Sequence, residues 1–161
     1  MIEDRKLIYK CAEHGLYYEG ESAFETKKIV TLAIDTLQLE IDYFTGSILS
    51  VTGFLPLFRS KKTSVEIPRK IEGVFFVPMK DIEYKKGIAY DFFKYFPQSA
   101  IYFLEDGLPV LEYDEEKKRI LVGSNGDSND KYVKINKNVI CGLDTENNVK
   151  SLFILLDIAI K

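Results

Sequence analysis

Short apolar runs separated by polar turns constrain this chain more than any other feature of its sequence. In the clearest example, residues 37–42 (Leu-Gln-Leu-Glu-Ile-Asp) alternate strictly, which places the apolar side chains on one face of a strand. Gly46 can then take the positive φ of a turn, and residues 48–55 are typical of a returning strand. We therefore predict a hairpin over residues 37–55 with Leu37, Leu39 and Ile41 facing the core.

The same pattern predicts about nine strands in total. The further candidates are residues 28–34, 64–67, 74–77, 102–104 with 110–113 as a second hairpin, 119–122, 139–143 and 149–160. Residues 152–156 are apolar on both faces, so we expect that strand to be central and covered twice. Pro109 indicates that the return strand of the second hairpin starts at a sheet edge.

One segment has helical spacing. Ala89, Phe93 and Phe96 recur at that spacing and stop at Pro97, while residues 22–25 fit a capping box that would precede a further helical turn. The fold class we predict is α+β, mainly β. Its antiparallel sheets, a sandwich or half-barrel, are built from hairpins with one or two short helices packed on them. Residues 1–161 are expected to form a single globular β-rich domain.

Composition limits the classes of protein to which the chain can belong. Hydrophobic residues make up 46% and the formal net charge is −3, which disfavours disorder and a whole-molecule attraction to nucleic acid. The frequent Ile, Lys, Asn, Tyr and Phe suit an AT-rich bacterial genome. The N-terminus lacks the apolar core of a secretory signal, and the longest apolar stretch, 152–160, is about half a membrane span. We expect a cytoplasmic protein that does not bind membranes.

Cys11, His14 and Cys141 are the residues that could support metal binding or thiol chemistry. Cys11 and His14 have the C-x-x-H spacing of two metal ligands, and His14 could instead activate either thiol as a nucleophile. A closed zinc site takes three or four ligands, so Cys141 would have to lie close to the pair. Buried thiols and a loop histidine are the simpler interpretation, and we expect no metal and no cofactor.

Three other features have a structural and a functional interpretation. Residues 124–130 are rich in oxygen ligands, but Tyr132 and Asn138 stand where a calcium loop from Asp127 needs Gly and Glu, so a solvated turn is favoured. Asp157 interrupts an apolar strand, either as a buried carboxylate or as a strand end reaching solvent. The aromatic side chains within residues 84–96, interleaved with lysines, could stack on single-stranded nucleic acid, but their helical spacing favours core packing.

Charge is distributed unevenly along the chain. Residues 59–70 carry five bases and one acid. Residues 99–116 contain six acids and no base: Glu105, Asp106, Glu112, Asp114, Glu115 and Glu116. Such runs are often solvated loops, but an acidic edge also suits a basic partner.

These six acids form the partner-binding surface that we predict, and no catalytic residue is assigned. The expected function is a small protein-binding module, with an immunity-type inhibitor of a basic toxin, such as a nuclease, as its concrete form. This expectation depends on the acidic run, the edge strand at Pro109 and the absence of linear catalytic motifs. Two alternatives stay open: a β domain that encloses a small ligand, and an enzyme that uses scattered carboxylates.

Overall fold

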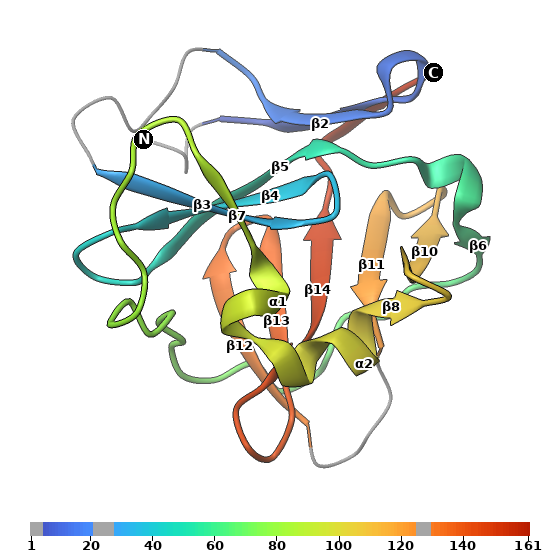
Figure 1. The fold of residues 1–161 in the computed structure, drawn as a ribbon. Helices are drawn as coiled ribbons and strands as arrows, with labels where there is room; N and C mark the ends of the chain where they lie inside the picture. The colour runs from blue at the N-terminus through green and yellow to red at the C-terminus, as the bar shows by residue number, and fades with distance from the viewer. Residues whose placement is uncertain (1–4, 21–27, 125–129) are drawn as a thin grey trace.

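A computed structural model describes residues 5–20, 28–124 and 130–161 as two β-sheets that lie over one another, with two short helices beside them (Figure 1). The first sheet has seven strands in the order β15-β1-β2-β5-β4-β3-β7. Its strands are β1 (Leu7–Lys10), β2 (Gly15–Tyr18), β3 (Ile29–Ile34), β4 (Leu37–Asp42), β5 (Ile48–Phe54), β7 (Ala89–Asp91) and β15 (Ile158–Ile160).

The second sheet has six strands in the order β12-β13-β14-β11-β10-β6. They are β6 (Lys61–Lys62), β10 (Leu111–Asp114), β11 (Arg119–Gly123), β12 (Lys131–Asn136), β13 (Val139–Leu143) and β14 (Val149–Leu155). A separate two-stranded hairpin consists of β8 (Leu104–Glu105) and β9 (Leu108–Pro109). Most neighbouring strands are antiparallel, and the parallel pairs are β1 with β15, β3 with β7 and β6 with β10. The fold is therefore mainly β, as predicted.

One apolar core lies between the two sheets. Leu32 and Leu39 from the first sheet and Ile120, Leu152 and Ile154 from the second belong to the same cluster of buried side chains, and each has no exposed surface. Burial of this apolar area is the main stabilising contribution in such a fold. The register of β4 is the predicted one, because Leu37, Leu39 and Ile41 are all buried and the 37–55 hairpin forms.

The helices lie at one end of this core, in front of the sheets in Figure 1. They are α1 (Phe92–Tyr95) and α2 (Ala100–Phe103), and the described residues also form the 3-10 turns η2 (Cys11–Glu13), η3 (Leu57–Arg59) and η4 (Pro97–Ser99). Phe92 from α1 and Phe103 from α2 have no exposed surface and pack against each other edge to face. The helices thus contribute one buried phenylalanine each to the core.

The second face of the six-stranded sheet is covered by residues 61–74, which we call the strap. The strap begins as β6 beside β10, and in Figure 1 it passes behind the sheet. Val65 is buried on Leu121, Ile140 and Phe153 in a second apolar cluster. Because β14 lies between β13 and β11 and is covered on both faces, the prediction of a central, doubly covered strand is confirmed.

The structure corrects several strand predictions. Residues 64–67 and 74–77 are not strands; the first belongs to the strap, and the second has one isolated bridge, Ser47 to Phe76. Strands β1, β2 and β12 were not predicted. The predicted strand over 149–160 is two strands, β14 and β15, in different sheets. The prediction that Pro109 opens an edge strand is wrong for the main sheet, because Pro109 ends β9 and β6 flanks β10.

Two helix predictions are also revised. Ala89 lies in β7, and the helix begins only at Phe92, where the Asp91 carboxylate accepts a hydrogen bond from the Phe93 amide at 3.0 Å. A 3-10 turn and α2 follow Pro97, so Tyr102 and Phe103 belong to a helix end rather than to a strand. The capping box at 22–25 lies outside the described residues. None of the described helices has the length and apolarity needed to cross a membrane.

Candidate functional site

The six predicted partner-binding acids lie along one side of the second sheet, but they are not equally exposed. Glu105 and Asp106 are exposed on the β8–β9 turn, and Glu115 and Glu116 are exposed on the β10–β11 turn. These turns stand at opposite ends of β10, a strand of roughly 13 Å. The two remaining acids lie within β10 itself: Glu112 is half-buried and Asp114 is buried.

Asp114 has a structural role that its sequence position did not predict. Its carboxylate accepts hydrogen bonds from the Val65 amide at 3.0 Å and from the Lys117 amide at 3.0 Å. These two bonds, with that from Val65 first, hold the pKa of the Asp114 carboxyl below its usual value. Asp114 therefore joins the strap to the β10–β11 turn, while the neighbouring Tyr113 ring points into the core, where burial raises its pKa to about 12.

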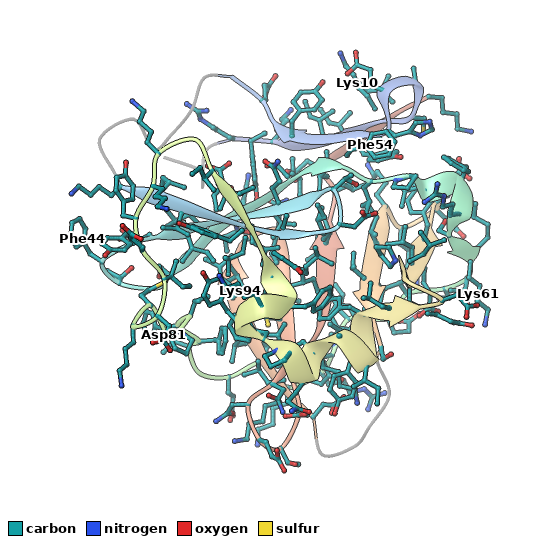
Figure 2. The ribbon with its side chains drawn as sticks, viewed as in Figure 1. Lys10, Phe44, Phe54, Lys61, Asp81 and Lys94 are labelled. Carbon is teal, nitrogen blue, oxygen red and sulfur yellow. The ribbon has the colours of Figure 1, made fainter. Side chains whose placement is uncertain are left out.

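The basic segment, residues 59–70, lies directly against the acidic one. Lys61 faces Glu112 in the parallel β6–β10 ladder, and Figure 2 shows Lys61 at this rim of the molecule. The Lys117 ammonium lies 2.9 Å from the Glu66 carboxylate, and this pair lowers the pKa of Glu66. The Arg119 guanidinium donates to the Val65 carbonyl at 3.0 Å. Glu66, the one acid of the basic segment, is thus paired, and its partner Lys117 lies just beyond the acidic run.

The three residues that were considered for metal binding or thiol chemistry do not form one site. Cys141 has no exposed surface, lies in the core on β13, and has its pKa raised to about 12 by burial. The His14 ring lies edge-on to two phenylalanine rings, at 5.4 Å from Phe54 and 5.1 Å from Phe58. Within residues 5–20, 28–124 and 130–161, no group of three or more His, Cys, Asp or Glu side chains could hold a metal ion.

Asp157 marks the corner where the chain leaves one sheet for the other. Its carboxylate accepts hydrogen bonds from the Leu7 amide at 2.8 Å and from the Asn138 side chain at 3.1 Å. The Lys137 ammonium lies 3.9 Å away, and about a third of the Asp157 side chain is exposed. The interpretation of Asp157 as a strand end that reaches solvent is confirmed, and the carboxylate also fastens β1 to the β12–β13 turn.

The aromatic side chains within residues 84–96 pack against the core. Phe92 stacks on Phe96 with ring centroids 4.5 Å apart, and Tyr84, Tyr90, Phe93 and Tyr95 are partly buried on the same cluster. Core packing, the favoured interpretation of this segment, is confirmed. Of the calcium-like stretch at 124–130, residues 125–129 lie outside the described part of the chain.

A groove of about 870 Å³ borders the other edge of the six-stranded sheet. It lies between strap residues 66–74 and the start of β12, and Leu143 and Asn147 also line it. Its lining combines apolar side chains, such as Val74 and Val133, with both cations and carboxylates. A second hollow, beneath the β3–β4 turn, holds only about 10 Å³. Of these two hollows, the groove is the one with room for a ligand.

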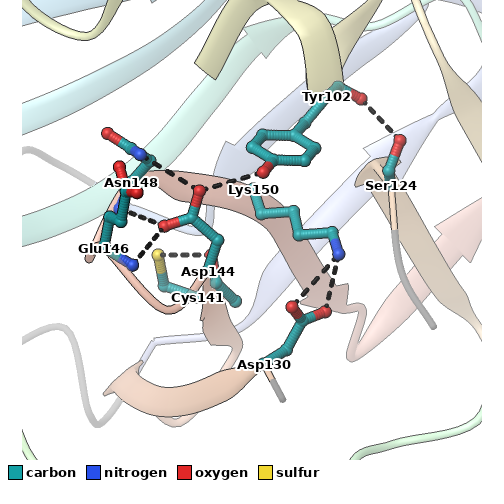
Figure 3. A network of polar contacts seen from close by, with 9 residues as sticks. Tyr102, Ser124, Asp130, Cys141, Asp144, Glu146, Asn148 and Lys150 are labelled. Atoms are coloured by element: carbon teal, nitrogen blue, oxygen red, sulfur yellow. Dashed lines mark hydrogen bonds and ion pairs between the residues drawn. The ribbon is translucent and has the colours of Figure 1, made fainter. Parts of the chain in front are cut away.

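A polar network lies next to this groove (Figure 3). The Lys150 ammonium lies 3.0 Å from the Asp130 carboxylate, and both side chains are more than nine-tenths buried. The same ammonium lies 5.2 Å from the centroid of the Tyr102 ring, and the Tyr102 hydroxyl donates to Asp144 at 2.9 Å. The network thus ties α2, β12 and the β13–β14 loop to one another.

The pKa shifts in this network favour a structural role for it over acid–base catalysis. Burial alone would raise the pKa of Asp144, but hydrogen bonds from Asn148, Tyr102 and the Glu146 amide outweigh it and leave the pKa lowered. The bond to Asp144 raises the pKa of Tyr102, because an ionised phenol could not donate it. An acid with a lowered pKa beside a phenol with a raised one is poorly matched to proton transfer near neutral pH.

Sequence reasoning missed the residues of the groove and the network. Lys150 carried a usable signal, since a lysine at the start of a doubly apolar strand needs a buried partner as much as Asp157 does. Its partner Asp130 is 20 positions away, with no local pattern to connect the two. Arg69 belongs to the basic segment that the sequence singled out, whereas nothing in the sequence distinguished Lys131 from other surface bases.

Comparison with models of known protein families finds no match, and comparison with curated proteins finds no significant relative. The function therefore has to be inferred from the geometry of the chain itself.

Proposed function

We propose that this chain is a protein-binding module for a basic partner, and that it acts as an immunity-type inhibitor of a basic toxin domain such as a nuclease. The observation that supports the proposal is the exposure of Glu105, Asp106, Glu115 and Glu116 on two turns at opposite ends of β10. Carboxylates placed in this way attract a basic surface over a distance and orient it during encounter.

The acids at the β10–β11 turn are held on a fixed support. The Lys117 amide donates to Asp114, and β11 pairs with β10 and β14 on either side. A turn held in this way loses little conformational freedom on binding, which favours affinity. Of the four acids, Glu115 has an ion pair, to Lys161 at 3.1 Å, and both side chains are exposed, so the pair is weak and exchangeable.

The test compares two charge-reversed variants with equal changes in net charge. The first carries E105K, D106K, E115K and E116K. The control reverses four exposed acids elsewhere: Glu13, Glu19, Asp81 and Glu146, each to Lys. Immobilised wild-type chain should capture a basic protein from the cells that make it, and rising salt should release that protein.

The first variant should associate with the captured protein about tenfold or more slowly at low salt, and the control should associate as fast as the wild type. Stoichiometric wild-type chain should also inhibit the catalytic activity of the captured protein. Equal association of both variants would place recognition elsewhere, and an acidic captured protein would exclude the proposed charge complementarity.

A further inference from the structure

We infer that the groove between the strap and β12 binds an extended, acidic segment of a partner protein. This inference goes beyond the proposed function, because β12 and β10 lie toward opposite edges of the six-stranded sheet. The groove lies along an edge strand, where an incoming extended chain can align with the strand direction. With about 870 Å³ of open space, it suits a length of chain better than a small molecule that must be largely enclosed.

Three carboxylates and three cations line the groove, and two further cations, Lys117 and Lys150, pair with its carboxylates from outside the lining. Each of its three carboxylates has a cation: Glu66 has Lys117 at 2.9 Å, Glu72 has Lys70 at 3.7 Å, and Asp130 has Lys150 at 3.0 Å. The two other cations that line it, Arg69 and Lys131, have no ion-pair partner in the part of the chain that the structure describes. Both are exposed. The groove therefore has two free positive charges and complements a ligand with carboxylates.

The apolar side chains of the groove define the rest of the ligand. Val74 is 73% exposed, an unusual position for a β-branched apolar side chain next to a hollow. Ile67 and Tyr132 are half-buried, and Gly73 lies close to the Val133 side chain. An apolar side chain placed on Val74 would remove that surface from water. The expected ligand is thus an extended segment in which acidic residues flank an apolar one.

Nucleic acid fits these features less well. A polynucleotide carries a phosphate at every residue, whereas the groove offers two cations without an ion pair among the described residues, Arg69 and Lys131. Sequence-tolerant binding of single strands also requires open aromatic faces on which bases stack. The aromatic ring that lines the groove, that of Tyr132, already lies edge to face with Phe153 at 5.9 Å.

The experiment selects ligands without assuming their sequence. A random peptide library displayed on phage is panned on the immobilised full chain, and enriched peptides are synthesised with a fluorescent label for anisotropy titrations. We expect enriched sequences with Asp or Glu on both sides of an apolar residue. The R69E/K131E variant should weaken their binding about tenfold or more, and V74D should weaken it as well.

The matched control is K80E/K86E, which makes the same charge change at two exposed lysines outside the groove and should alter affinity less than about twofold. If charge reversal unfolds the chain, R69Q/K131Q tests the same contacts. Basic enriched peptides, no enrichment, or equal weakening by groove and control variants would each overturn the inference. So would a labelled single-stranded oligonucleotide that binds through Arg69 and Lys131 while no acidic peptide does. The E105K/D106K/E115K/E116K variant should bind the peptides normally, so a failure here is separable from a failure of the proposed function.

Discussion

The two edges of the six-stranded sheet are closed in different ways. At the β10 edge, β6 adds a short parallel strand, and the Asp114 carboxylate accepts a hydrogen bond from the Val65 amide of the strap. At the β12 edge, the strap makes one backbone hydrogen bond, from the Glu72 amide to the Tyr132 carbonyl at 2.9 Å, and leaves a groove. Exposed strand edges invite pairing with other chains, so proteins usually cover or charge them. Here one edge is covered and the other remains accessible.

This contrast explains why linear charge runs were a poor guide to exposed charge. The bases of residues 59–70 and the acids of β10 are far apart in sequence, yet the strap places Lys61 opposite Glu112 and Glu66 beside Lys117. The two charge runs are therefore neighbours in the fold, and Asp114 of the acidic run is buried. Exposed acids stand at the two ends of β10, and the exposed bases Arg69 and Lys131 stand beside the groove.

The largest loss of stability is expected from replacing Lys150, whose partner Asp130 precedes β12. K150M leaves the Asp130 carboxylate buried without its cation, which typically costs about 3–5 kcal/mol of unfolding free energy. Urea unfolding followed by circular dichroism measures this loss. The K150M/D130L variant removes both charges and should recover most of it, since an apolar pair needs no compensation. The control K131M, at an exposed neighbour, should change stability by less than about 0.5 kcal/mol. A loss below about 1 kcal/mol for K150M would mean that solvent screens the pair.

The parts of the fold that the sequence predicted are those that local pattern determines. The 37–55 hairpin alternates strictly around a short turn, and its register depends on neighbours within that hairpin. β13 is a continuous apolar run because both of its faces are buried. In the hairpin the side-chain period determines which face is buried, and in β13 the continuous apolar run indicates that both faces are.

The parts that were missed depend on distant residues. Residues 64–67 have the composition of a strand, yet the Val65 amide donates to a side chain, Asp114, rather than to a ladder carbonyl. β12 alternates irregularly because its pairing with β13 shifts register near Asn136. The groove forms where the strap and β12 come together at the sheet edge. Its lining residues are far apart in the sequence, so no single segment predicts it.

A smaller effect is expected at the β10 edge, and it depends on pH. The lowered pKa of Asp114 means that its bonds to the Val65 and Lys117 amides stabilise the fold above about pH 4 and that this contribution is lost as pH falls further. D114N should therefore lower stability at pH 7, less than K150M does, and the difference from wild type should shrink below about pH 4. Urea unfolding of both proteins across that range measures it, with E112Q as the control on the same strand. A difference that does not change with pH would show that the ionised form of Asp114 adds nothing.

The smallest effect concerns how the strap opens. Two of its amides are bonded at the β10 edge, Thr63 to the Tyr113 carbonyl and Val65 to Asp114, whereas the Glu72 amide has the one bond at the β12 edge. Val65 is buried and Glu72 is exposed beside the groove. Because local opening starts where few contacts must break, we expect the strap to open from its β12 end.

Amide hydrogen exchange measured by NMR tests this order. After correction for intrinsic rates, Glu72 should exchange about tenfold faster than Val65, a difference of about 1.4 kcal/mol in opening free energy. D114N should accelerate exchange at Val65 and leave Glu72 unchanged, because the two ends are fastened by separate contacts. Equal protection at both amides would mean that the strap opens as one unit. Slower exchange at Glu72 would reverse the comparison and make the β12 edge the firmly closed one, which would also leave less freedom for the groove to admit an extended chain.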